Sequence, residues 1–159
     1  MRYLFVLFLC LCALPTWAAP DKTDVTAAMI YRLTKFIDWP QHAFPNTDAP
    51  FTICFDTVTP TFEKLSKVPL KPWHGREVEV TSDVSDQCQV LVVESTEVAE
   101  GVGPHTLLVG ENISFLDDGG HIAFQFTRGR IGFHVNRSSA QEKGLTLSAE
   151  LLSLARHVR

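Results

Sequence analysis

The chain has 159 residues, with 14 Lys and Arg against 18 Asp and Glu, which gives a formal net charge of −4 and favours one domain with its own core over two. Hydrophobic residues make up 45% and charged residues 20%, which excludes a disordered, collagen-like or coiled-coil chain. The acidic balance argues against a general nucleic-acid binder, because such proteins carry a basic surface that neutralises phosphates.

The N-terminus has the pattern of an export signal. An apolar run follows Arg2 and extends to Leu14, and a proline and a small-residue pattern ending at Ala18 come next. This pattern predicts a signal peptide over residues 1–18, cleaved after Ala18. The alternative, a membrane anchor, needs about 20 apolar residues, and this run is shorter and lacks a following basic cluster. We expect the mature chain, residues 19–159, to be a single exported domain that is not inserted in the membrane.

Two cysteines, Cys54 and Cys88, remain after this cleavage. In an oxidising compartment such a pair predicts a disulfide, which stabilises a fold by about 2 to 4 kcal/mol. A catalytic cysteine or a metal site is the weaker alternative, because the chain has no Cys-x-x-Cys and no His-Glu-x-x-His motif.

The first element predicted in the mature chain is an amphipathic helix over Asp24–Asp38. Its apolar residues recur at helical spacing, and Thr23 or Asp24 is available as the N-cap. We expect the helix to end near the Trp39-Pro40 pair, because proline cannot continue the helical hydrogen bonds. The proline-rich segment 41–50 is then a loop.

The middle of the chain predicts strands, one helix and a short crossover. The expected elements are a strand at Phe51–Asp56, a helix at Thr61–Lys67, an edge or half-buried strand at Arg76–Thr81, and buried parallel strands at Val90–Val93 and Leu107–Val109. The link 82–89 is short for a parallel crossover. Two interpretations stay open: one tight helical turn, or a neighbouring strand that runs antiparallel.

An antiparallel hairpin is the clearest local pattern, with strands His121–Thr127 and Arg130–Asn136 around an Arg128-Gly129 turn. Alternation separates the residues into two faces, one with Ile122, Phe124, Phe126, Ile131, Phe133 and Val135, and the other with His121, Gln125, Thr127, Arg130, His134 and Asn136. We expect the phenylalanines to be core and the two arginines beside the turn to be exposed.

The C-terminal segment predicts a short helix at Ser138–Lys143, ended by Gly144, and a last helix at Ser148–Val158 that packs on the sheet. Taken together, the elements predict an α/β fold. Its mixed sheet is of the three-layer type, with mostly parallel N-terminal strands and a C-terminal antiparallel hairpin, flanked by helices.

The sequence carries no motif for catalysis, a cofactor or a metal. No nucleophile elbow, phosphate loop or dinucleotide loop is present. His121 and His134 fall on one face of the hairpin and could approach diagonally, but a metal site needs a third ligand, so solvated polar residues are the favoured interpretation. We therefore expect a protein that is not an enzyme.

The charges are unevenly distributed along the chain. Residues 19–118 carry seven basic and 16 acidic side chains, whereas residues 119–159 carry six basic and two acidic ones. Such a field can steer an oppositely charged protein surface or an anionic ligand. The alternative is that these charges scatter over different faces once the chain has folded.

A candidate partner surface combines aromatic and basic residues. Phe36, Trp39 and Pro40 end the first helix with more aromatic surface than a helix end needs, and Trp is enriched among interface hot spots. Together with Arg128 and Arg130 they are predicted to form an apolar anchor with a charged rim. The alternative is that Trp39 covers the sheet.

Several of these stretches together resemble the YfiR-like family of small exported bacterial proteins. Arg128-Gly129 departs from the expected acidic or amide residue plus glycine, and the second cysteine pair of some relatives is absent. The resemblance covers nearly the whole mature chain, and the matching stretches are Ala28-Met29-Ile30-Tyr31, Lys35 to Pro40, Phe51 to Phe55, Cys88 to Val93, Gly119-Gly120, Val135-Asn136 and Gly144 to Ala155.

The resemblance implies a periplasmic regulatory protein without catalysis. Some members bind the periplasmic domain of an inner-membrane diguanylate cyclase and restrain it, which lowers cyclic-di-GMP output and biofilm formation. The alternative functions are a periplasmic small-ligand-binding module without a cyclase partner and, less favoured, an enzyme with an unrecognised site. Association of two copies as a homodimer stays open.

Overall fold

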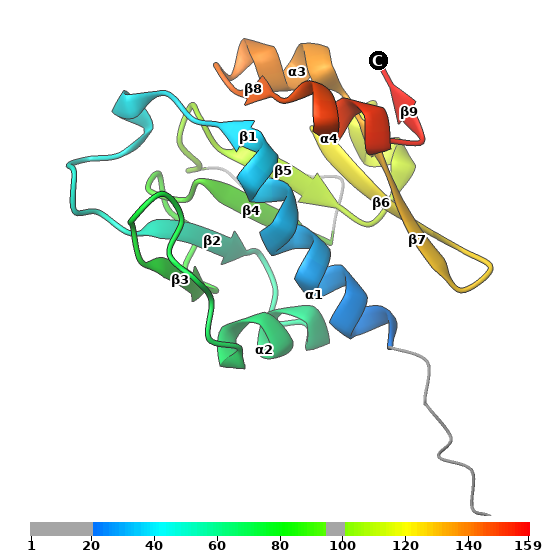
Figure 1. Cartoon of the computed structure of the whole chain (residues 1–159), viewed down its shortest axis with the longest axis horizontal. Helices are drawn as coiled ribbons and strands as arrows, with labels where there is room; N and C mark the ends of the chain where they lie inside the picture. Colours follow the sequence, from blue (N-terminus) through cyan, green and yellow to red (C-terminus); the bar gives the residue numbers. More distant parts are fainter. Residues whose placement is uncertain (1–20, 95–100) are drawn as a thin grey trace, which may run out of the picture.

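Seven strands form one mixed sheet at the centre of the structure (Figure 1). The computed structural model describes residues 21–94 and 101–159. From one edge to the other, the strands are β3 (Val78–Thr81), β2 (Phe51–Phe55), β4 (Val90–Val93), β5 (Leu107–Gly110), β6 (Ile122–Thr127), β7 (Arg130–Val135) and β9 (His157–Val158). Pairing is parallel from β3 to β6, antiparallel between β6 and β7, and parallel between β7 and β9. The predicted α/β fold is confirmed.

The helices gather on one face of the sheet. They are α1 (Lys22–Leu33), α2 (Pro60–Lys67), α3 (Arg137–Glu142) and α4 (Ala149–Leu154), and they share one large apolar core with alternate residues of the strands. In Figure 1, α1 runs across the sheet. The opposite face has a smaller core that includes Cys54, Leu91 and Phe115, and it is covered by irregular segments and the 3-10 turn Ile113–Leu116. The third layer is therefore thin, because the chain places its longer helices on one side only.

The first helix is shorter than predicted. It ends at Leu33, and the segment that follows forms a 3-10 turn and then the strand β1 (Ile37–Asp38), which pairs with β8 (Thr146–Leu147). The hydroxyl of Thr34 donates to the carbonyl of Tyr31 at 2.7 Å, and such a local bond competes with the helical ones. Pairing with β8 offers the backbone an alternative to continuing the helix.

The last predicted helix is also too long. α4 ends at Leu154, and the chain then extends into β9, where the N–H of Arg156 donates to Phe133 and that of Arg159 to Val135. These bonds satisfy the open edge of β7, which explains why the chain leaves the helix. Leu154, predicted to pack on the sheet, is 63% exposed.

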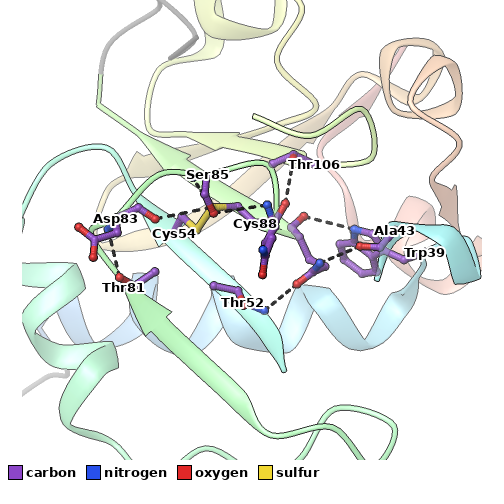
Figure 2. The surroundings of a disulfide bond; sticks show 11 residues. Trp39, Ala43, Thr52, Cys54, Thr81, Asp83, Ser85, Cys88 and Thr106 are labelled. Carbon is purple, nitrogen blue, oxygen red and sulfur yellow. Dashed lines mark hydrogen bonds between the residues drawn. A yellow bond between two sulfur atoms is a disulfide. The ribbon is translucent and has the colours of Figure 1, made fainter. Parts of the chain in front are cut away.

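The link 82–89 crosses over β2. Both β3 and β4 are parallel to β2 and lie on either side of it, so the antiparallel alternative is wrong. An eight-residue link is long enough because it has to run back along only one short strand. β3 and β4 have four residues each, and four extended residues measure about 13 Å. The predicted disulfide is confirmed: Cys88 in the link is bonded to Cys54 in β2, with their Cα atoms 5.8 Å apart (Figure 2).

The hairpin has the predicted register, with Phe124 opposite Phe133 and Thr127 opposite Arg130. Arg128 and Gly129 both have positive φ, as a two-residue hairpin turn requires. Phe124 and Phe133 are buried, but the expectation that Phe126 is core is wrong, because it is 39% exposed. The end of the hairpin extends beyond the helices that cover the rest of the sheet (Figure 1), and Phe126 is paired with Ile131 one position before the last pair, Thr127 with Arg130.

Two phenylalanines on the same hairpin face should therefore differ in their effect on stability. We expect Phe124→Ala to lower the free energy of unfolding by about 3 to 5 kcal/mol, because it leaves a cavity in the core. Phe126→Ala should cost less than about 1 kcal/mol, as at other exposed sites. Urea unfolding followed by fluorescence measures both, and equal losses would mean that the hairpin end is packed in solution.

Loss of the disulfide should also lower stability strongly. Replacing Cys54 and Cys88 together by Ser is expected to cost about 3 to 4 kcal/mol, because the bond closes a loop with a sequence separation of 34. Reduction of the unmodified protein should give a similar loss in the same unfolding assay. Unchanged stability in both experiments would contradict a structural role for this bond.

Candidate functional site

An apolar surface with basic neighbours lies at the hairpin end. We define the hairpin surface as Ile113, Phe126, Ile131, Arg128 and Arg130. The three apolar residues line a hollow of about 340 Å³ between the start of α1 and the hairpin. Ile113 is 37% and Phe126 39% exposed. An exposed aromatic side chain beside an exposed isoleucine is the composition of a protein contact.

The charges at this surface favour an acidic partner. The Lys22 ammonium lies 5.8 Å from the centre of the Phe126 ring and is paired with Glu111 at 2.6 Å. Within residues 21–94 and 101–159, Arg128 and Arg130 have no ion-pair partner within 4.0 Å. Their guanidinium groups are therefore available to carboxylates of another molecule.

The C-terminal basic residues gather only in part. Arg128 and Arg130 lie at the hairpin end, and Arg156 lies farther along the hairpin, with Nη1 3.4 Å from Oε1 of Gln125. Arg159 is paired with Asp117 at 2.6 Å, which neutralises it. The excess of basic residues in the C-terminal part of the sequence is thus concentrated along the hairpin in the folded chain and does not cover half of the molecule.

Trp39 belongs to the core, which corrects its assignment to an exposed anchor. It is 8% exposed, and its Nε1 donates to the carbonyls of Gln89 at 3.2 Å and His105 at 3.0 Å. Its ring packs edge-on against Phe51 and Trp73, with centroids 5.0 and 5.6 Å away. The alternative that Trp39 covers the sheet is the one that the structure supports.

The structure does not bring together the two halves of the predicted partner surface. Phe36 and Pro40 are half-buried and follow the end of α1. Lys22, at the other end of this 12-residue helix, contacts Phe126 near the hairpin turn. Because such a helix is about 18 Å long, the aromatic residues after it and the arginines of the hairpin form separate regions.

His121 is fully buried, whereas the sequence predicted a solvated side chain. Its Nδ1 accepts a hydrogen bond at 3.0 Å from the N–H of Leu108 in β5. The imidazole thus takes the place of a main-chain carbonyl of the neighbouring strand. Among the described residues its Nε2 has no partner. Burial, and to a smaller extent the Lys143 charge, lowers the pKa of His121 to about 4. The residue is thus a neutral structural imidazole.

His134 lies on the opposite strand in a different environment. It is half-buried, and its Nε2 lies 3.2 Å from Oε1 of Gln125. Partial burial lowers the pKa of His134, and the charges of His157 and Arg156 lower it further. In the part of the chain that the structure describes, no three His, Cys, Asp or Glu residues are placed to hold a metal ion.

A buried polar residue beside the disulfide was not predicted from the sequence. Gln89 is 2% exposed; its Oε1 accepts from the N–H of Thr52 at 2.7 Å and its Nε2 donates to the carbonyl of Ala43 at 3.0 Å. Its partners Thr52, Ala43 and Trp39 are labelled in Figure 2. The one signal in the sequence is a polar residue directly before the apolar run of β4, which alone does not reveal its partners. Gln89 holds the loop after β1 against the sheet.

Acid should destabilise the protein through His121. The pKa of this residue is about 4 in the folded chain and about 6.5 in the unfolded chain, so the folded state favours the neutral form. Its contribution is complete above pH 6.5 and is lost as the pH falls from 6.5 towards 4. Between pH 7 and pH 5 we expect a loss of about 2 kcal/mol in unfolding free energy. Urea titrations at both pH values measure it.

A matched pair of variants tests whether His121 causes this pH dependence. His121→Asn removes the titrating group and should flatten the profile, whereas His74→Asn should leave it intact. His74 is exposed and has a φ of 45°, a conformation that asparagine tolerates. A profile that is equally steep in His121→Asn would mean that another group carries the effect.

The fold and the hairpin surface define a small α/β protein with an exposed basic and apolar hairpin. In the described ranges, no helix is long and apolar enough to cross a membrane. The sequence model of the YfiR/HmsC-like family matches residues 23–156. The chain therefore belongs to the YfiR/HmsC-like family. Members of this family are periplasmic regulators, which supports a periplasmic, regulatory and non-catalytic role for the protein.

The chain is also similar to a solved structure. A crystal structure of a conserved domain protein from Vibrio cholerae O1 biovar El Tor aligns with a TM-score of 0.49 and 12% sequence identity. The alignment covers 89% of this chain and 62% of that one, so the chain spans less than two thirds of that protein. A comparison with curated proteins gave no match. Cleavage after Ala18 stays a prediction, because residues 1–20 lie outside the described residues.

Proposed function

We propose that this protein binds the periplasmic domain of an inner-membrane signalling protein of the diguanylate cyclase type and restrains it. Binding lowers cyclic-di-GMP output and, through it, biofilm formation. Family membership supports the regulatory role. The observation that carries the proposal for this chain is the hairpin surface, on which Phe126 is 39% exposed, Arg128 lies in the turn and Arg130 is paired with Thr127.

The composition of this surface suits a protein contact. Aromatic and Arg side chains are enriched among the residues that dominate binding energy. Burial of Phe126 and Ile113 under a partner would remove apolar area from water, and the two arginines would pair with carboxylates at the rim. The tight turn and the six paired positions of the hairpin keep the surface ordered before binding, which lowers the entropy cost of association.

The proposal is tested in the source organism. Deletion of the gene should raise cellular cyclic-di-GMP, measured by mass spectrometry, and the unmodified gene should restore the level. Arg130→Glu should fail to restore it, because the reversed charge repels an acidic partner, and Phe126→Ala should restore it only in part. Leu154→Ala, which removes an exposed apolar side chain at the end of α4 and not at the hairpin end, is the matched control and should restore it fully.

Binding is measured with the same variants. The purified protein, crosslinked to solubilised inner membranes, should capture a membrane protein that carries a cyclase domain, and the affinity for its purified periplasmic domain should fall about tenfold or more with Phe126→Ala. An unchanged cyclic-di-GMP level after deletion would contradict the proposed function. If both hairpin variants restored the cyclic-di-GMP level fully, the partner would instead contact another surface of the protein.

A further inference from the structure

A mostly apolar groove lies between α1 and α2, away from the hairpin surface. Its volume is about 390 Å³. The small side chains of Ala27 and Ala28 form the floor on α1, and Leu65 of α2 and the segment 68–70 form the opposite wall. Val68 is 44% exposed and borders the opening. We refer to this feature as the α1–α2 groove.

Tertiary contacts hold the groove open without a ligand. Oη of Tyr31 donates to the carbonyl of Lys71 at 2.7 Å, which fixes the far wall to α1. The carboxylate of Asp24 pairs with Lys64 at 2.6 Å and joins the two helices at the other end. The walls are therefore preformed, as is usual for small-molecule sites.

The rim of the groove is basic although this part of the chain is acidic. Four of the seven basic residues between positions 19 and 118 line it, against one acid, Asp24, which is already paired. Arg32 and Lys71 have no ion-pair partner among the described residues, and the Lys35 ammonium lies 4.9 Å from the Tyr31 ring centre. Unpaired cations around an apolar floor favour a ligand with one anionic group and an apolar body.

We propose that the α1–α2 groove binds a small amphipathic carboxylate. The apolar body lies on Ala28, Leu65 and Val68, and the carboxylate pairs with Arg32 and Lys71 at the rim. A volume of about 390 Å³ is near the lower end for ligand pockets, so it suits a chain or ring of about ten heavy atoms and not a whole lipid. The proposal does not depend on the partner surface at the hairpin.

Isothermal titration calorimetry with the full mature protein and decanoate as the probe tests the groove. We expect a single site, weakened about tenfold or more by Arg32→Gln, which removes a charge-assisted hydrogen bond to the carboxylate. The control is Lys67→Gln, because Lys67 lies on α2 outside the groove and is paired with Glu63. This control should bind decanoate normally.

Two further probes separate charge from apolar contact. Decanol, which has the chain without the charge, and acetate, which has the charge without the chain, should both bind at least about tenfold more weakly. Ala28→Leu fills the groove from an exposed helical position that tolerates leucine, and it should abolish binding while the melting temperature is retained. Phe126→Ala should bind decanoate normally, which separates this result from the hairpin proposal.

Absence of decanoate binding to the unmodified protein, or an affinity in Arg32→Gln and Ala28→Leu as high as that of the unmodified protein, would overturn the proposal. Equal affinity for decanol would also overturn it, because the basic rim would then have no role. Loss of binding in Ala28→Leu counts only with an unchanged melting temperature. If that variant unfolds, the comparison of Arg32→Gln with Lys67→Gln decides.

Discussion

The crossover from β3 to β4 is the constraint on which the rest of the structure depends. The link passes over β2 without a helix, and the disulfide from Cys88 to Cys54 fastens it to that strand. Its end is fixed by Gln89, whose main-chain N–H and side-chain Oε1 both bond to Thr52. The link itself buries few large apolar side chains, so covalent and hydrogen bonds replace the packing that a crossover helix would supply.

The same junction positions the helical face of the sheet. The carbonyl of Gln89 accepts from Trp39, and the Trp39 ring packs against Phe51 and Trp73. Nε1 of Trp73 in turn donates to the carbonyl of Thr34 at the end of α1 at 3.1 Å. One end of α1 is therefore anchored through Trp73 and Trp39 to the junction at Gln89, and its start lies beside the hairpin (Figure 1). Trp39, which suggested an interface in the sequence, is thus part of the contacts that anchor this helix.

Patterns that are local in the sequence predicted the structure well. The hairpin register follows from strict alternation around Arg128-Gly129, and the buried strands β4 and β5 from continuous apolar runs. The ends of α1 and α4 were not predictable, because β1 and β9 form only where a distant strand offers free hydrogen bonds. His121 and Phe126 were misplaced for the same reason: alternation gives the face of a residue, but not which distant segment covers it.

Local charge outweighs net charge in determining what this protein attracts. The chain is acidic overall, at a formal −4. Both proposed contact surfaces nevertheless present cations that have no ion-pair partner in the part of the chain that the structure describes: Arg128 and Arg130 at the hairpin, and Arg32 and Lys71 at the groove. At physiological ionic strength the Debye length is about 8 Å, so an approaching group responds to the charges closest to it and little to the rest of the molecule. Acidic side chains that lie farther away are screened by the salt and therefore do not repel an anion from either site. Where acidic side chains dominate the surface, they disfavour non-specific contact with other anionic molecules.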